Sequence, residues 1–567
     1  MLRCVIRSYG FRKLIGLNLR TTSAFGIKRR MLDLLHVQFI LLAAVFLLAG
    51  CRLNQSTESA TSASPPPQNP VPVSSMRTVA RMHWLGIKHL SGETNAAHLV
   101  EIWNLPESRR LERQTLDNFS LAPWRLWHRS IDTNAAALLR PLLDDVVEDE
   151  SCLEIRQATN QPGELAFAIR LSTPRAALWQ TNLARVLESL TDIHPVPAPD
   201  NQYGWSLKKH HVPNFIELTR AGEWTIVGAA QDHNDWVAEL KSSIQRGQAP
   251  LMTGDTNDWL EVNLDPAQLV RSLTTFNFQL STLNHFHLAV IGDGTNVLAH
   301  GTADFSKPLA LDLQPWNIPT NLIDERLSSF TLLRGFQPWL ASSKAWTNLQ
   351  VGPSPDQICF WAQQGLPMQS YFAVPLPDAS NEVDRLTDWV LQNQYHWFPT
   401  NDLSKFERSK EFNGLQWKGL PYMWLFLRSI TVNNQNFVYG GGFPNLQAYP
   451  ISEKWLQEVL ASTNLVYYDS EKTGLRIEQW LYMGQFARFV THKSQLPSDS
   501  LGMFWLKAIA PKLGYSVTRI TETGPSQLSF VRRSSLGFTA VELNLLADWL
   551  ESPQFPLGLH TLLAPPG

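Results

Sequence analysis

A short apolar run decides the fold of this chain: Phe167-Ala168-Ile169-Arg170-Leu171, which returns as Phe372-Ala373-Val374-Pro375-Leu376. Each copy of the run follows a stretch that begins with a cysteine, Cys152 or Cys359, and each precedes a helical pattern of apolar residues. Short apolar runs bounded by turn residues predict β-strands. The sequence therefore predicts the same strand–strand–helix unit at two places in the chain.

Beyond these runs, the order of predicted elements is the same in the two parts of the chain. Two or three further strands end in small residues, at 227–230 and 439–442, and a helix, a strand and a hairpin follow in each case. We therefore expect two tandem copies of about 190 residues each, at 152–342 and 359–552. The mixture of hairpins and helices predicts an α+β fold, with a mainly antiparallel sheet and helices packed on it.

Residues 76–151 stand outside the two copies and are expected to form an α/β N-terminal extension. Its last element is predicted as a helix from Asn134 to Glu148. The duplicated arrangement loosely resembles uncharacterised duplicated α+β proteins of bacterial envelopes. That resemblance implies no particular activity.

The N-terminus carries an export pattern. An apolar run of 11 residues, Phe39 to Ala49, follows the basic residues Lys28-Arg29-Arg30. The run is too short for a stable membrane-spanning helix, which needs roughly 20 apolar residues. The closing residues Leu48-Ala49-Gly50-Cys51 resemble the lipobox of bacterial lipoproteins. The resemblance implies that residues 1–50 are a signal peptide and that the Cys51 thiol receives a diacylglycerol, which would anchor the protein to a membrane.

Residues 51–75 are expected to be a lipidated cysteine followed by a disordered Ser/Thr/Pro tether, because they contain almost no apolar side chains. By analogy with bacterial lipoproteins, Arg52 in place of an aspartate after the lipidated cysteine favours the outer membrane, facing the periplasm. Once residues 1–50 are removed, 40 basic residues remain against 49 acidic ones, a net charge of −9. An acidic chain without basic clusters argues against nucleic acid as a partner.

Three histidines are the main candidates for a metal site. His285 and His287 are two residues apart on a predicted strand, so they share a face, and Asp293-Gly294 reads as a two-residue hairpin turn. That turn would place His300 directly opposite His287. Three imidazoles on one face can hold a catalytic zinc and leave one coordination position open for water. The alternative to a metal site is that these are exposed or hydrogen-bonded histidines of a sheet without a functional role.

The cysteines Cys152 and Cys359 occupy equivalent positions in the two predicted copies. In an oxidising compartment they form a disulfide if they lie close to the axis that relates the copies, and otherwise they are two separate buried thiols.

The sequence thus supports two functions. The first is a non-enzymatic, lipid-anchored envelope protein that binds another envelope protein or a glycan. The second is a metal-assisted hydrolase or lyase that uses His285, His287 and His300.

Overall fold

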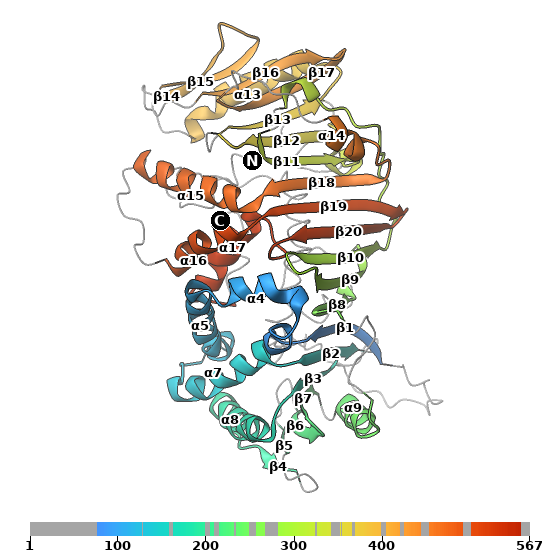
Figure 1. Ribbon diagram of the computed structural model, residues 1–567, viewed down its shortest axis with the longest axis vertical. Helices are drawn as coiled ribbons and strands as arrows, with labels where there is room; N and C mark the ends of the chain where they lie inside the picture. Colours follow the sequence, from blue (N-terminus) through green and yellow to red (C-terminus); the bar gives the residue numbers. More distant parts are fainter. Residues whose placement is uncertain are drawn as a thin grey trace, which may run out of the picture.

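The computed structural model describes residues 76–556, apart from the segments 128, 158–162, 199–203, 209–214, 232–233, 249–256, 267–281, 324–325, 342–351, 353, 366–368, 398–403, 420–423, 444–452 and 491–499. The predicted signal peptide, Cys51 and the tether lie outside the described residues. The predicted α+β fold with a mainly antiparallel sheet is confirmed. One sheet of 20 strands forms the spine of the molecule, and every pairing in it is antiparallel (Figure 1).

The first half of the sheet contains the strands β1 (Arg77–Trp84), β2 (Ser151–Gln157), β3 (Glu164–Arg170), β4 (Val196–Pro197), β5 (Trp205–Lys208), β6 (Phe215–Ala221), β7 (Trp224–Ala230), β8 (Leu260–Leu264), β9 (Leu283–Gly292) and β10 (Val297–Phe305). The second half contains β11 (Leu327–Arg334), β12 (Gln357–Gln363), β13 (Ser370–Pro375), β14 (Ser404–Arg408), β15 (Gly414–Gly419), β16 (Leu425–Val432), β17 (Gln435–Gly442), β18 (Leu465–Lys472), β19 (Tyr515–Gly524) and β20 (Gln527–Ser534).

The pairings place the strands in the spatial order β4-β5-β6-β7-β3-β2-β1-β8-β9-β10-β20-β19-β18-β11-β12-β13-β17-β16-β15-β14. This order is symmetric about its centre. Each strand of one half corresponds to the strand of the other half whose number differs by ten, so β4 at one edge corresponds to β14 at the other. The two halves meet where β10 pairs with β20. The predicted N-terminal extension supplies β1, which lies inside the sheet between β2 and β8.

A single row of paired residues crosses the ten central strands. In spatial order it contains Cys152, His83, Glu261, Ala289, His300, Val531, Arg519, Tyr468, Leu332 and Cys359. His300 and Val531 are paired at the centre of this row, and the two cysteines stand at its ends. Nine strand spacings of roughly 4.8 Å separate the cysteines, which puts them on the order of 40 Å apart.

The helices are α3 (Ile87–Leu90), α4 (Ala97–Trp103), α5 (Pro106–Ser120), α6 (Ala122–Leu126), α7 (Thr133–Glu148), α8 (Thr173–Thr191), α9 (Asp235–Gln245), α11 (Gln337–Ala341), α13 (Ala379–Trp397), α14 (Glu453–Leu460), α15 (Thr473–Val490), α16 (Leu501–Ile509) and α17 (Ala540–Glu551), with short 3-10 turns at 94–96, 320–322 and 510–512. Among the described helices, none is long and apolar enough to cross a lipid bilayer.

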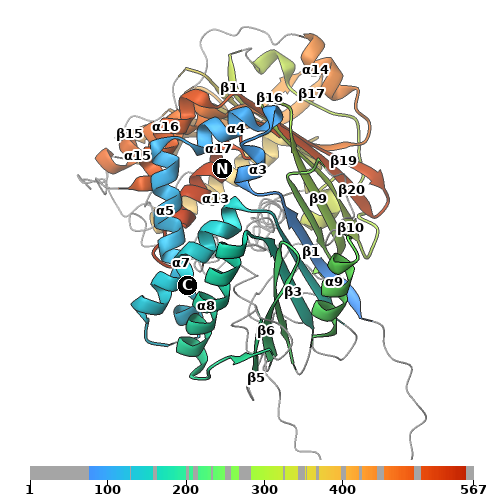
Figure 2. The same ribbon diagram turned by 60° about the horizontal axis from the view of Figure 1, so that its bottom comes forward.

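One face of the sheet is covered by a layer of helices, among them α5, α7, α8, α16 and α17 (Figure 2). The helix predicted at Asn134–Glu148 is confirmed as α7, and the Asp132 side chain caps its start by accepting from the backbone N–H of Asn134 and Ala135. The largest apolar core lies between this layer and the sheet. It includes Leu142 of α7, Trp179 of α8 and Phe286 of β9.

On the other face, the described residues cover the sheet towards its two ends. In the first half, α9 packs over β3, β6 and β7. In the second half, a loop that carries Trp316, Ile318 and Ile323 joins an apolar cluster with Phe330 of β11 and Leu456 of α14. Between these covered ends, the strands β1, β8, β9, β10, β20 and β19 turn alternate side chains away from the helix layer. We call this surface the open face.

Candidate functional site

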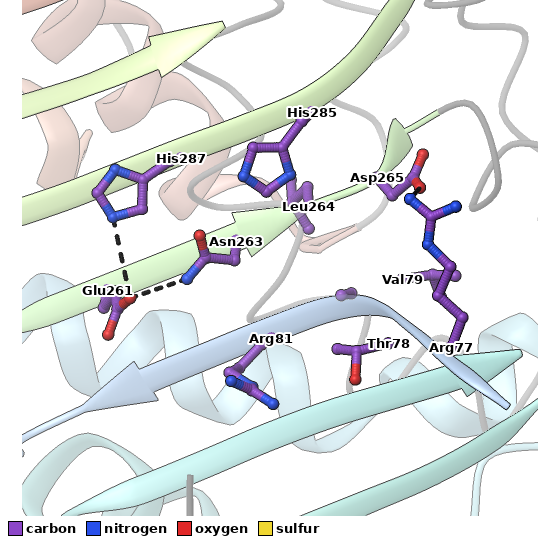
Figure 3. Close-up of a pocket in the computed structure, with 11 residues that line it drawn as sticks. Arg77, Thr78, Val79, Arg81, Glu261, Asn263, Leu264, Asp265, His285 and His287 are labelled. Atoms are coloured by element: carbon purple, nitrogen blue, oxygen red, sulfur yellow. Dashed lines mark hydrogen bonds and ion pairs between the residues drawn. The ribbon is translucent and has the colours of Figure 1, made fainter. Parts of the chain in front are cut away.

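A cleft of about 460 Å³ lies on the open face over β1, β8 and β9 (Figure 3). Its lining consists of Arg77, Thr78, Val79, Ala80, Arg81, Glu261, Asn263, Leu264, Asp265, His285 and His287. Four of these side chains are charged, two are histidines and one is an asparagine. These seven polar groups distinguish the cleft from the apolar core on the other side of the same strands.

The alternation of side chains along β8 and β9 positions the polar groups. Val262 of β8 and Phe286 and Leu288 of β9 are buried in the main core. Because successive residues of a strand point to opposite faces, their neighbours Asn263 and His287 point into the cleft. The two residues are paired across the strands, and Figure 3 shows their side chains next to each other.

The predicted pairing of the histidines is wrong by two residues. His287 is paired with Thr302, and His300 is paired with Ala289. The reason is the turn, which takes four residues because the Asp293 carboxylate accepts from the backbone N–H of both Thr295 and Asn296. A shift of two residues keeps His300 on the same face as His287 but moves it diagonally away.

The three predicted zinc ligands do not form a metal centre in the structure. Within the described segments, no three His, Cys, Asp or Glu side chains are arranged to hold a metal ion. The carboxylate of Glu261 lies 3.8 Å from Nε2 of His287. Burial lowers the pKa of His287, against the opposing effect of Glu261, and the nearby His300 and His285 lower it further. His287 is therefore neutral at pH 7.

Buried ion pairs support one wall of the cleft. Glu154 of β2 is completely buried, and Nε and Nη2 of Arg81 lie 3.1 and 3.0 Å from its Oε2. The Thr78 hydroxyl donates to Oε1 of Glu154 at 2.6 Å, and Nε of Arg156 donates to the same oxygen at 2.9 Å. A buried carboxylate with this many donors is fixed in place, so Arg81 is held in one orientation beside the cleft.

Arg77 is one of the nine residues of the cleft that the sequence did not single out. It is the first residue of β1, and its Nη2 lies 3.2 Å from Oδ2 of Asp265. The Arg77 side chain is 73% exposed, whereas that of Asp265 is 13% exposed. No local pattern distinguishes Arg77 from other arginines, because its neighbours in the cleft come from β8 and β9, far along the chain.

Of the two alternatives for Cys152 and Cys359, the structure shows two separate buried thiols and not a disulfide. Both are buried free cysteines, at opposite ends of the central row of paired residues. A disulfide requires Cα atoms within about 7 Å, and the strands between the two residues hold them far beyond that. Burial raises the pKa of both thiols well above the usual value, so they stay protonated and unreactive.

Comparisons with known proteins found no match: no family model fits the sequence, and no curated protein or solved structure resembles it.

Proposed function

We propose that this chain is a lipid-anchored protein of the bacterial envelope, attached to the outer membrane through Cys51, that binds another envelope molecule and does not catalyse a reaction. The observation that carries the proposal is the open face with its polar cleft. Over six strands, none of the described residues covers this sheet face, whereas a layer of helices lies on the other face, so the open face is available to a partner.

The chemistry of the cleft favours binding over catalysis. Its arginines are held in ion pairs with Glu154 and Asp265, which suits recognition by fixed donors. The buried thiols of Cys152 and Cys359 have raised pKa values and are unsuited to act as nucleophiles.

We also propose that the body arose by tandem duplication, with boundaries that differ from those the sequence suggested. In support, β1 pairs with β2 and β8 as β11 pairs with β12 and β18. This correspondence starts one copy at β1, within the extension at 76–151, and the other at β11, within the stretch 152–342. The pseudo-two-fold axis then passes through the pair of His300 and Val531.

The position of β1 links the anchor to the cleft. Arg77 begins β1 directly after the Ser/Thr/Pro segment and also lines the cleft. If residues 51–75 form the disordered tether that their composition predicts, its root-mean-square length would be roughly 28 Å. The lipid anchor would therefore keep the cleft close to the membrane surface.

Two measurements in cells test the proposal. In membrane fractionation, the full chain should sediment with outer membranes and Cys51→Ala should not, while Cys152→Ala, a cysteine change in the body, should fractionate like the unmodified chain. A photo-crosslinking amino acid at Thr302, on the open face, should capture an envelope component in the anchored protein, and one at Arg113, exposed on α5, should not. Membrane retention of Cys51→Ala, or equal crosslinking at the two positions, would contradict the proposal.

A further inference from the structure

We infer that the cleft on β1, β8 and β9 binds the oxyanion of a small polar ligand, a carboxylate or a phosphate, through Arg77 and His285. The inference rests on the proposed binding function and names the chemistry that the open face recognises. It is carried by two donors that face the same cleft with unused hydrogen-bonding capacity.

Arg77 provides the first donor. A guanidinium has five N–H groups, and the contact with Asp265 involves the single nitrogen Nη2. The backbone around it is fixed, because Arg77 is paired with Gln157 and the N–H of Asp265 donates to the carbonyl of Val79. A largely exposed guanidinium on a fixed strand can take an oxyanion by two parallel hydrogen bonds at small entropic cost.

His285 provides the second donor. It is exposed at the start of β9, and its ring has no hydrogen-bond partner among the residues that the structure describes. Figure 3 shows the ring over β8, on the side of the cleft where Asp265 and the guanidinium of Arg77 lie. An oxyanion held by Arg77 would therefore find an imidazole N–H on its other side.

The charged groups around the cleft pair with one another. Asp265 is engaged by Arg77, Glu154 by Arg81, and Glu261 by the side-chain amide of Asn263 at 2.8 Å and by His287. Arg81 is already paired with Glu154, so the guanidinium that remains largely exposed to an incoming anion is that of Arg77. Burial lowers the pKa of His287, so at pH 7 this ring adds no positive charge to the cleft.

The corresponding place in the second half is closed by the chain itself. By the pairing of the strands, Phe330 stands where Arg81 does and Tyr468 where Glu261 does. Both are buried in the apolar cluster beneath the loop with Trp316 and Ile318. In the second half, apolar residues therefore cover this part of the sheet. In the first half, polar residues line the corresponding place, which is the cleft.

The test uses the purified full chain and three probes: glucuronate, its neutral analogue glucose, and inorganic phosphate. Saturation-transfer NMR at pH 6 should detect glucuronate and not glucose, and phosphate should displace glucuronate if both oxyanions use the cleft. If glucuronate binds and phosphate does not compete, the site is a carboxylate site; if phosphate binds and glucuronate does not, it is a phosphate site.

Two arginine variants locate the site. Arg77→Gln should weaken binding of glucuronate at least tenfold. Arg533→Gln is the matched control, because Arg533 is also a largely exposed arginine of the open face paired with one aspartate, Asp293, but it lies outside the cleft. His285→Gln should also weaken binding of glucuronate.

Several results would overturn the inference: saturable binding of neither anion, equal binding of glucose and glucuronate, or binding that Arg77→Gln leaves unchanged. None of them affects membrane fractionation or crosslinking in cells, so a failure of this inference can be told apart from a failure of the proposed function.

Discussion

Arg334, the last residue of β11, is the side chain whose replacement tests the packing of the second half most sharply. It is 2% exposed, and its guanidinium donates to four backbone carbonyls. These are Leu465 at 2.8 Å, Gln314 at 2.6 Å, Ser462 at 3.0 Å and Thr463 at 2.7 Å. The guanidinium also lies 4.4 Å from the ring centroid of Trp316. The Arg334 side chain therefore links the loop that carries Trp316 to the start of β18 by hydrogen bonds.

The variant Arg334→Met keeps most of the side-chain volume and removes all the donors. Each of the four hydrogen bonds lost costs about 1 kcal/mol, so together they cost about 4 kcal/mol, and the contact with Trp316 adds about 1 kcal/mol. Burial lowers the pKa of Arg334, which indicates that its charge is costly to bury. Relief of that cost offsets part of the loss, and we expect the free energy of unfolding to fall by about 3 kcal/mol.

Urea denaturation followed by tryptophan fluorescence measures this loss, and hydrogen exchange shows whether residues 306–323 exchange faster in the variant. Arg408→Met is the control, because Arg408 is 46% exposed and pairs with Asp384 and Asp388 at the surface. It should cost less than about 1 kcal/mol. A loss below about 1 kcal/mol in Arg334→Met, with unchanged exchange in the loop, would refute the reasoning.

Three further predictions follow from single contacts. Burial raises the pKa of Glu217 to about 7 from 4.5. Since the pKa in the folded state lies above that in the unfolded state, stability is lost as the pH rises from 4.5 towards 7. The melting temperature of Glu217→Gln should therefore exceed that of the unmodified protein at pH 8 and equal it at pH 4. An equal difference at both pH values would show that the charge is not the cause. Cys152 and Cys359 should resist iodoacetamide in the folded protein and react in urea, and a disulfide-linked peptide pair would contradict the fold. In Gly228→Ala the new Cβ would lie 2.4 Å from Cγ2 of Val237, costing about 1–3 kcal/mol; the added change Val237→Ala should recover part of the loss, and no recovery would place the strain elsewhere.

The sequence predicted the elements that have a local signal. The run at 167–171 belongs to β3, the helix that follows begins at Thr173, and the helix before Cys152 is α7. In these places, side-chain periodicity and capping residues lie within a few positions of one another, so the local pattern is sufficient.

The register of the histidine hairpin could not be predicted in the same way. Asp293-Gly294 is a common two-residue turn, but the Asp293 side chain accepts from Thr295 and Asn296 and lengthens the turn to residue 296. The choice between these turns depends on a side-chain hydrogen bond and on the neighbouring strand, since Arg533 of β20 also donates to Asp293. Composition alone does not distinguish them.

The place of β1 and the cleft depends on contacts between distant parts of the chain. β1 is inserted between β2 and β8, which follow it by about 70 and 180 residues. No periodicity reports such a pairing, so Arg77 looked like an ordinary residue after a linker. The same long-range strand pairings place Cys152 far from Cys359. The sequence indicated that the two cysteines occupy equivalent positions, but it did not indicate the distance between them.

The most direct test of the central claim, that this is a lipid-anchored envelope protein, is mass spectrometry of the N-terminal peptide from protein extracted from membranes. The account predicts a peptide that begins at Cys51 and carries the mass of a diacylglycerol on that residue, with or without a further amide-linked acyl chain. A peptide that begins upstream of Cys51, or one in which Cys51 is unmodified, would contradict it.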